Sequence, residues 1–288
     1  MGLVVVGHAA LAAGRVGDAL VSLREAWAGL AESGHEFRFR CRTLLATALG
    51  QAGLADQAAP LLAEIAAGQH PAYQLLLPDD LLARAWGAAA EGATTEALGH
   101  AVAAADLARE SGEPAYEVLA WQTAVQLGGA PAALPRLTDL SGRSPRAAVA
   151  RDHARAWVDG DGDRLLDIAD AWARLGDLVA AGDAAAQAAD LHRRRGRQGS
   201  ALSAAALAER LAVRSGACTP ALAVAARPLP LTAREREIAV LAARGLSNKE
   251  IAEHLTVSVR TVEGHLYRAG RKLGVSDRAA MTDIVGVE

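Results

Sequence analysis

Apolar side chains recur at helical spacing along most of this 288-residue chain, and this periodicity limits the fold more than any other feature. A clear example, with steps of four, three, four and three residues, is the series Val16, Leu20, Leu23, Trp27 and Leu30. Steps of this size place side chains on one face of an α-helix. No convincing alternation of apolar and polar residues, the pattern typical of strands, occurs. The periodicity therefore predicts an all-α fold.

Glycines divide the first 216 residues and predict where the helices turn. Gly14, Gly53 and Gly92 follow one another at intervals of 39 residues, and we expect them, together with Gly176, at turns inside helical hairpins. A second set is expected to end the second helix of each hairpin: Gly34, Gly68, Gly112, Gly196 and Gly216. The interval between its first two members is 34 residues, which is the period of a tetratricopeptide repeat.

Residues 1–216 are therefore predicted to form a regulatory domain of about five or six antiparallel helix pairs, stacked as a solenoid that resembles degenerate tetratricopeptide repeats. The repeat register between residues 113 and 176 stays open, and a general helical bundle is the alternative. All five tryptophans lie in this region. We expect most of them to pack between helices and one or two to line a concave surface.

Residues 217–230 are expected to be a Pro-rich linker between two domains. They contain Pro220, Pro228 and Pro230 and little charge. Because proline cannot continue a helix, three prolines so close together favour a semi-rigid spacer. The second domain is then expected over residues 231–288.

This second domain shows the signals of four short helices. Thr232 and Ser247 are each followed three residues later by a glutamate, Glu235 and Glu250, which is the pattern of a capping box. The second helix is expected over residues 248–255, and Ser258 is expected to cap the third after a short turn. Two helices joined in this way are the parts of a helix-turn-helix.

The third helix separates apolar from polar side chains. Its expected inner face consists of Val262, Leu266, Ala269 and Leu273, and its expected outer face consists of Arg260, Glu263, Gly264, Tyr267 and Arg271. Residues 259–273 contain four basic residues and one acidic residue, so this segment carries a charge of plus three, although the whole chain carries minus three. A merely solvated face is the alternative, but the basic charge on a helix-turn-helix favours duplex DNA as the partner.

The C-terminal residues resemble the DNA-binding domain of the LuxR-type (GerE-like) transcriptional regulators. The matching positions are Leu231, Thr232, Arg234, Glu235, Glu237, Ala243, Gly245, Ser247 to Ala252, Leu255, Val257, Ser258, Thr261, Val262, His265, Lys272, Leu273, Val275 and Arg278. The resemblance implies a four-helix DNA-binding domain. With its helical repeats, the chain also resembles the C-terminal part of the large ATP-binding LuxR-type regulators, and it is either a fragment of such a protein or a shorter relative.

The resemblance also implies roles for individual residues. Bases of the major groove would be contacted by Glu263, Gly264 and Tyr267. Many members have lysine at the position of Glu263, so this carboxylate either accepts a hydrogen bond from cytosine or pairs with Arg260 or Arg268. Further DNA contacts, mainly to phosphates, are expected from Lys249, Ser258, Arg260, Thr261, His265, Arg268, Arg271 and Lys272. For His265, a hydrogen bond that positions the helix is an equal alternative.

The last helix, expected from about residue 277 after a cap at Ser276, resembles the dimerisation helix of the same family. Its small apolar strip is Ala280, Met281 and Ile284. A two-fold homodimer would bind an inverted repeat in a promoter. We therefore expect a transcriptional activator that acts with RNA polymerase and whose helical repeats receive an unknown protein or small-molecule signal.

The sequence indicates no enzyme, cofactor or metal site. Neither lysine, Lys249 or Lys272, lies in a phosphate-binding loop, and the eight histidines lack the spacing of metal ligands. Cys41 and Cys218 give no disulfide framework. Residues 159–163 begin like a calcium loop but lack its later ligands, which favours a polar turn between helices. No membrane span or signal peptide is evident, so we expect a cytoplasmic protein.

Two other classes of function remain open. A sigma-factor-like promoter-binding subunit has a similar pattern in its last region, but the run from Ser247 to Ala252 and His265 favour the LuxR-type interpretation. A protein-interaction scaffold with vestigial DNA binding is the other alternative.

Overall fold

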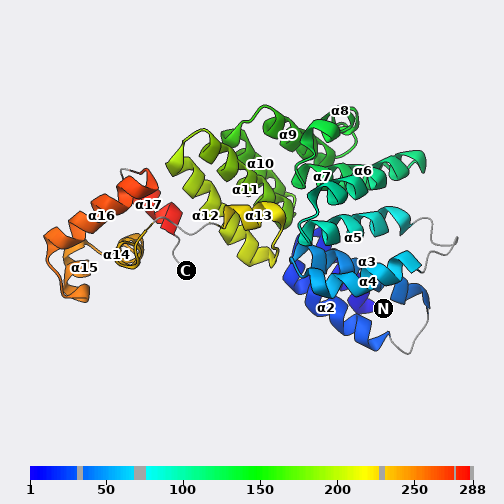
Figure 1. The fold of residues 1–288 in the computed structure, drawn as a ribbon, viewed down its shortest axis with the longest axis horizontal. Helices are drawn as coiled ribbons and strands as arrows, with labels where there is room; N and C mark the ends of the chain where they lie inside the picture. The colour runs from blue at the N-terminus through cyan, green and yellow to red at the C-terminus, as the bar shows by residue number, and fades with distance from the viewer. Residues whose placement is uncertain (31–34, 68–75, 227–230, 276, 286–288) are drawn as a thin grey trace.

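The computed structural model describes residues 1–30, 35–67, 76–226, 231–275 and 277–285. Over these residues the chain is helical without any strand, which confirms the all-α prediction. Figure 1 shows a large array of stacked helices followed by a smaller C-terminal group. No helix within these ranges is both long enough and apolar enough to cross a membrane.

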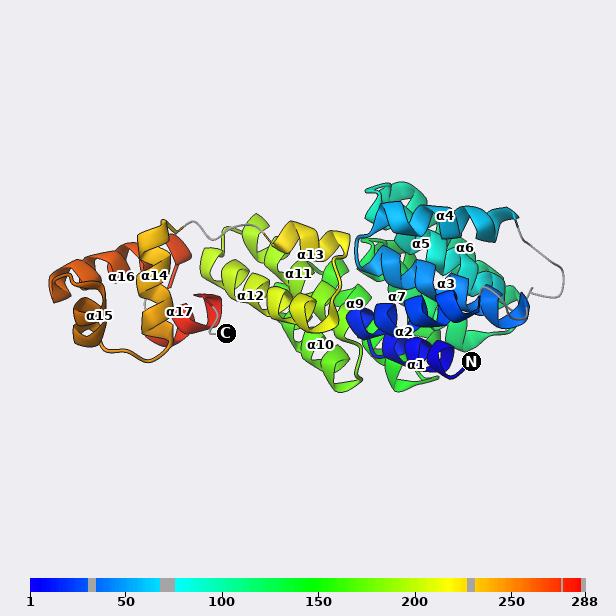
Figure 2. The same cartoon turned by 90° about the horizontal axis from the view of Figure 1, so that it is seen from below.

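Helices α1 to α12 form six consecutive pairs over the described residues. Figures 1 and 2 show these pairs following one another along the array. The first helices of the pairs are α1 (Gly2–Ala12), α3 (His35–Gln51), α5 (Leu77–Ala90), α7 (Pro114–Gln126), α9 (Pro145–Val158) and α11 (Leu178–Arg194). The second helices are α2 (Val16–Gly29), α4 (Ala55–Ala67), α6 (Thr94–Glu110), α8 (Ala130–Leu140), α10 (Gly162–Arg174) and α12 (Gln198–Ser215). This arrangement is consistent with the predicted tetratricopeptide-like solenoid.

Glycines in the left-handed conformation make the turns, with one change from the expected register. The three glycines spaced 39 residues apart lie inside the first three pairs, with φ of +62°, +72° and +81°. Gly176 was expected inside a hairpin but lies between α10 and α11, whereas Gly196 lies inside the last pair. Two complete short pairs, α7–α8 and α9–α10, lie between Gly112 and Gly176. Gly176 therefore follows the second helix of a pair, and Gly196 lies between the two helices of the next pair. Gly34 and Gly68 lie outside the described residues.

The first pairs of the array close against the last pair. The backbone N–H of Leu178 donates to the carbonyl of Ala13 at 3.4 Å, and that of Cys218 donates to the carbonyl of Gln51 at 2.8 Å. Gly14 approaches α11 so closely that a Cβ at this position would lie 2.5 Å from the Leu178 nitrogen. Only glycine fits there. The stacked helices therefore return to their start and surround the inner face.

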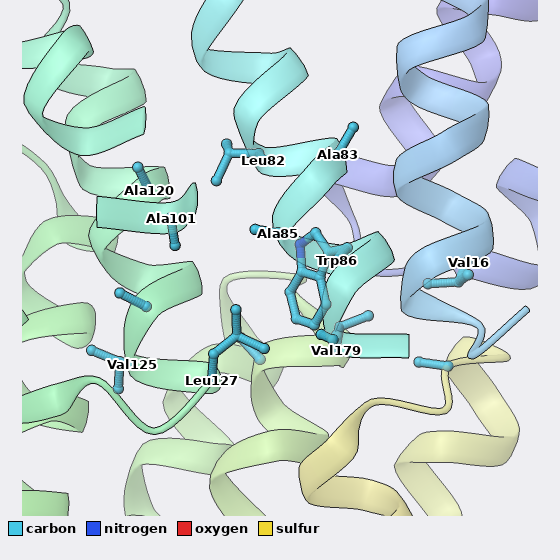
Figure 3. Packing of buried hydrophobic residues seen from close by; sticks show 14 of the residues in the cluster. Val16, Leu82, Ala83, Ala85, Trp86, Ala101, Ala120, Val125, Leu127 and Val179 are labelled. Atoms are coloured by element: carbon cyan, nitrogen blue, oxygen red, sulfur yellow. The ribbon is translucent and has the colours of Figure 1, made fainter. Parts of the chain in front are cut away.

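Alanine fills much of the core of the array, and large side chains pack between the alanine-rich helices. Figure 3 shows Trp86 of α5 among these residues, together with Ala85 and with Val179 of α11. Trp86, Trp121 and Trp172 are all buried, which confirms the packing role expected for most tryptophans. Small side chains allow helix backbones to approach closely, and the tryptophans fill the remaining volume.

Buried polar side chains also join the inner helices. Gln126 of α7 donates to Asp183 of α11 at 2.8 Å, and His153 of α9 lies 2.8 Å from Gln187 of α11. The indole N–H of Trp172 donates to the other ring nitrogen of His153 at 3.2 Å. Because an unpaired polar group in a core is costly, such mutual pairing fixes the three helices in one register.

The segment from Asp159 to Asp163 makes the turn between α9 and α10, as predicted, and its last two residues begin α10. Asp161 caps α10 by accepting a hydrogen bond from the backbone of Arg164 at 2.9 Å, and Asp163 pairs with Arg197 at 2.7 Å. No cluster of three or more potential metal ligands occurs among the described residues.

The predicted linker is partly folded. Thr219 caps a short helix, α13 (Pro220–Ala225), with Pro220 at its first position, where proline's missing N–H costs no hydrogen bond. Leu222 and Ala225 of this helix are buried in the core of the array. The array therefore extends beyond its expected end at residue 216. Pro228 and Pro230 lie outside the described residues.

The C-terminal group consists of α14 (Ala233–Ala243), α15 (Asn248–Leu255), α16 (Val259–Leu273) and α17 (Arg278–Val285). Ser276, the expected cap of the last helix, lies outside the described residues. One core cluster, which includes Ile238, Ile251 and Val262, joins α14, α15 and α16. A second cluster joins α14, α16 and α17.

Candidate DNA-binding interface

Local caps position the first two helices of the C-terminal domain. Both predicted capping boxes are present: Thr232 with Glu235 begins α14, and Ser247 with Glu250 begins α15. Thr256 then ends α15 in the left-handed conformation, with φ of 53°. A residue with a branched Cβ rarely adopts this conformation, and here it makes the tight turn into α16. Helices α15 and α16 thus form the expected helix-turn-helix.

Helix α16 presents the two faces that the sequence predicts. Val262, Ala269 and Leu273 are completely buried against the other helices of the domain. The exposed polar and aromatic side chains are those of Arg260, Thr261, Glu263, Tyr267, Arg268, Arg271 and Lys272. Helix α15 and the first turns of α16 lie at the end of the molecule far from the helical array (Figures 1 and 2). The polar face of α16 is therefore open to a large partner.

Glu235 binds two of the cations expected at the DNA. The ammonium group of Lys272 donates to Glu235 at 2.6 Å, and the Nε of Arg268 lies 3.7 Å from the same carboxylate. The hydrogen bond from Lys272, followed by that from the backbone of Thr232, lowers the pKa of Glu235 to about 2. Only 3% of Glu235 is exposed. Lys272 and Arg268 thus fasten α16 to the start of α14, a role for Glu235 beyond the expected cap.

Arg260 and Arg271 have no hydrogen bond or ion pair to any described residue, and both are exposed on α16. Lys249 on α15 is also exposed and lies 3.9 Å from Glu253, at the limit of an ion pair. Unpaired cations keep their full attraction for a polyanion, whereas a cation bound to a carboxylate has lost much of it. Among the five expected phosphate-binding cations, these three are therefore the most available.

The remaining polar residues at the start and middle of α16 are placed as follows. Ser258 caps the helix by accepting from the backbone N–H of Thr261 at 3.1 Å, and the two hydroxyls lie 2.8 Å apart. His265 lies 3.0 Å from the guanidinium of Arg268 through its Nδ1, consistent with a positioning hydrogen bond. Glu263 makes no ion pair with a described residue, so of its two predicted roles the pairing with Arg260 or Arg268 is absent.

The two glycines of α16 differ. A Cβ at Gly270 would lie 2.9 Å from the carbonyl oxygen of Val275, so glycine is required where the chain folds back toward α17. At Gly264 the nearest atom to an added Cβ is the end of Arg268, at 3.6 Å. No internal contact requires glycine at position 264, and its backbone is free to approach a partner.

Arg278 joins the last helix to the end of α14, a role the sequence did not reveal. Its guanidinium donates to the carbonyl of Ala242 at 2.9 and 3.1 Å and also to the carbonyl of Leu246. The carbonyl of Ala242 belongs to the last turn of α14 and that of Leu246 to the loop after it, where backbone acceptors need partners from outside the helix. The only signal in the sequence was the match of Arg278 to the LuxR-type pattern.

The residues expected at a dimer interface contribute to the core of the domain. Met281 and Ile284 are 7% and 3% exposed and pack with residues of α14 and α16, whereas Ala280 is half-buried. Leu202 of α12, in the helical array, packs against the same cluster. The backbones of the two domains also meet, because a Cβ at Gly199 would lie 2.7 Å from the oxygen of Gly274. The array thus covers part of the C-terminal domain beside α17.

Comparison with known proteins agrees with this geometry. The family described as bacterial regulatory proteins of the luxR family matches residues 229–285. Over 53 residues the chain is 47% identical to a putative HTH-type transcriptional regulator of Mycobacterium tuberculosis, a match that covers 18% of this chain and 6% of that protein. The oxygen regulatory protein NreC of Staphylococcus aureus is also 47% identical over 53 residues, which are 24% of its length.

The matched segment is thus a small part of each of these relatives, and no solved structure matches the chain. Within it lie both capping boxes, the left-handed turn at Thr256 and the exposed face of α16. Residues 229–285 of this chain are therefore a LuxR-family helix-turn-helix domain.

Proposed function

We propose that this chain is a DNA-binding transcriptional regulator whose helix α16 enters the major groove of duplex DNA. The observation that carries the proposal is the exposed face of α16, where Arg260 and Arg271 have no partner among the described residues and Tyr267 is 68% exposed between them. A large exposed aromatic ring beside unpaired cations is unfavourable in water alone and suits a groove lined by phosphates and bases.

The exposed residues have two kinds of role in this proposal. Arg260, Arg271 and Lys249 bind phosphates and supply most of the affinity through release of counterions. Glu263 and Tyr267 contact base edges, and Gly264 allows the backbone to come close. Because Glu263 has no cationic partner among the described residues, its carboxylate can accept from the amino group of cytosine.

A homodimer bound to an inverted repeat is part of the same proposal, with contacts between the two copies made along α17. Support comes from the family resemblance and from the position of α17 at the edge of its domain. Met281 and Ile284 hold the helix in place, and its exposed residues, such as Ala279, would meet the second copy. We propose that the dimer activates transcription by recruiting RNA polymerase.

Control by the helical array is proposed to act through the contact between α12 and α17. Leu202 is the array residue that packs on the α17 cluster, so movement of α12 would change the access of a second copy to α17. Leu202→Ala is expected to increase dimerisation and DNA affinity. Val213→Ala on the same helix, where the side chain is 79% exposed, is the control and should change neither.

The experiment that tests DNA binding is a fluorescence-anisotropy titration of the full chain with a random-sequence duplex at several salt concentrations. Wild type should bind more weakly as salt increases, and replacing both Arg260 and Arg271 by alanine should reduce the slope of log K against log salt by about 2. Binding that is absent, or equal for both proteins at every salt concentration, would contradict the proposal.

A further inference from the structure

The helical array encloses a cavity on its inner face that no role in DNA binding explains. Its volume is about 320 Å³, which is within the range of small-molecule sites. Residues of α1, α3, α5, α7, α9 and α11 all line it, together with Asp177 at the start of α11. The cavity exists because α1 closes against α11 through the contacts of Ala13 and Gly14 with Leu178.

Much of the cavity wall is apolar. Five large apolar side chains line it: Leu44, Leu82, Trp86, Leu119 and Val179. Leu44, Leu82, Trp86 and Val179 are 5%, 5%, 2% and 2% exposed, so their side chains are fixed by the surrounding core. Rigid apolar walls favour a ligand body that is itself apolar and that needs no rearrangement of the protein on binding.

Each end of the cavity carries a carboxylate that is already paired. At one end Asp79 pairs with Arg40 and accepts a hydrogen bond from Tyr116 at 3.0 Å. At the other end Asp177 accepts from Arg146 and from Gln122, both at 2.8 Å. Tyr116 and Gln122 lie six residues apart on α7, so the two ends are roughly 9 Å apart along the helix.

These pairs leave the cavity without net charge. Arg40 neutralises Asp79, Arg146 neutralises Asp177, and burial lowers the pKa of His8, which favours its neutral form. A ligand with a net charge would lose its hydration here without gaining a counter-ion, which is costly.

The cavity nevertheless offers hydrogen bonds. Gln51 lines it, and its buried side-chain oxygen accepts no hydrogen bond from any described residue. Arg146 uses only one terminal nitrogen, Nη1, for its bonds to Gln122 and Asp177. A donor on the ligand would satisfy Gln51, and an acceptor would meet the remaining guanidinium hydrogens of Arg146.

We propose that this cavity binds an uncharged, elongated small molecule with an apolar body and hydrogen-bonding groups at both ends. This inference deepens the sensing role proposed above for the array and names the chemistry of its ligand. Binding would join α1, α3, α5, α7 and α11 more firmly, and α11 packs directly against α12, the helix that contacts the DNA-binding domain.

A pair of fluorescent probes with the same ring system tests both the site and its preference for neutral ligands. N-phenyl-1-naphthylamine is uncharged, and 8-anilino-1-naphthalenesulfonate adds one sulfonate to the same skeleton. The full chain should bind the neutral probe saturably with one site, at least about tenfold more tightly than the sulfonate. Sulfonate binding of equal or greater affinity would overturn the proposal.

Two matched variants locate the binding site. Ala115 is exposed and lines the Asp79 end of the cavity, so Ala115→Trp should fill it and lower the affinity for the neutral probe by at least about tenfold. Ala132 on α8 is also exposed but does not line the cavity, and Ala132→Trp should bind the probe as wild type does. Equal binding by the two variants would also overturn the proposal.

The same preparations separate this inference from the proposed DNA binding. Both variants are titrated with duplex DNA and melted by circular dichroism, and Ala12→Trp, which fills the cavity from α1, replaces Ala115→Trp if the latter unfolds. Loss of probe binding in Ala115→Trp, with DNA binding unchanged, supports the cavity as the binding site. A wild type that binds DNA but not the neutral probe would contradict the cavity site alone, whereas one that binds the probe but not DNA would contradict the proposed function.

Discussion

Asp183 in the helical array and Glu235 in the DNA-binding domain are both buried carboxylates, but their pKa values move in opposite directions. Burial raises the pKa of Asp183 to about 7, and its partners, Thr219 and Gln126, are neutral donors. The hydrogen bond from the Lys272 ammonium lowers the pKa of Glu235 to about 2. Neutral donors therefore hold Asp183 inside the array, whereas the small domain uses a buried charge to fix a basic helix.

This difference explains how each domain can serve a separate task. The polar groups that join α7, α9 and α11 are satisfied inside the array, leaving a neutral inner cavity. In the C-terminal domain, Glu235 binds Lys272 and Arg268, while Arg260 and Arg271 remain exposed and unpaired among the described residues. Glu235 thus orients α16 through Lys272 and Arg268 and leaves the charges of Arg260 and Arg271 available for DNA.

The largest expected effect is a loss of stability in the helical array alone. Trp172 is completely buried and bonded to His153, so Trp172→Ala should lower the stability of the array by ~3–5 kcal/mol. All tryptophans lie in the array, so urea unfolding followed by tryptophan fluorescence reports on it alone.

Amide hydrogen exchange of α14 and α16 in the same variant provides the control for that experiment. Because the two domains have separate cores, the exchange rates of these helices should change little when Trp172 is removed. Equal destabilisation of both domains would show that they unfold as a single unit.

A smaller effect concerns the choice of DNA sequence. If Glu263 accepts from cytosine, Glu263→Ala should reduce the discrimination between preferred and other half-sites by ~1–3 kcal/mol. A binding selection from a randomised duplex library checks this, with Glu253→Ala on α15 as the control for loss of an exposed carboxylate. An unchanged selected sequence would assign Glu263 no role in base contact.

Arg271→Ala should weaken binding without changing the preferred DNA sequence. Its loss should weaken all sequences alike and lower the slope of log K against log salt by about 1, since one phosphate contact disappears. Arg143→Ala removes an equally exposed cation from the array and should leave the slope unchanged. If both substitutions changed the slope equally, net charge rather than α16 would govern the affinity.

The pH dependence of stability comes from the two carboxylates, and its sign differs between the domains. Glu235 contributes fully above its ordinary pKa of 4.5, and its contribution is lost as the pH falls through about 2. Asp183 is favoured in its protonated form, so stability of the array decreases as the pH rises from 3.8 through about 7.

Substitution with the neutral amides checks each assignment. Asp183→Asn should flatten the pH dependence of the free energy of unfolding of the array, followed by tryptophan fluorescence, between pH 3.8 and about 7. Glu235→Gln should flatten the acid dependence of hydrogen exchange in α14 and α16. If either profile stays as steep as in wild type, another group titrates there.

Local features could be predicted from the sequence because their partners lie within one helical turn. The caps at Thr232, Ser247 and Ser258 each bind a residue three positions ahead, and the two faces of α16 follow from its periodicity. Such signals are complete within a short window of sequence. The helix-turn-helix was therefore predictable in detail.

Contacts between distant residues were not predictable. Lys272 meets Glu235 across 37 positions, and Gly14 meets Leu178 only because the array closes on itself. Gly270 is required only because the chain folds back at Val275, 2.9 Å from where its Cβ would lie. The helical signal of α13 was hidden because Pro220 suggested a linker, although proline is well suited to a first helical position. These features depend on tertiary packing, which periodicity does not encode.

The most direct test of the central claim is chemical protection of DNA in complex with the full chain. Dimethyl sulfate methylates guanine N7 in the major groove and adenine N3 in the minor groove. With α16 in the major groove, guanines of the bound site should be protected at N7 in wild type and much less so when Arg260 and Arg271 are both alanine. Protection confined to adenine N3, or no protection under conditions of saturated binding, would contradict the account.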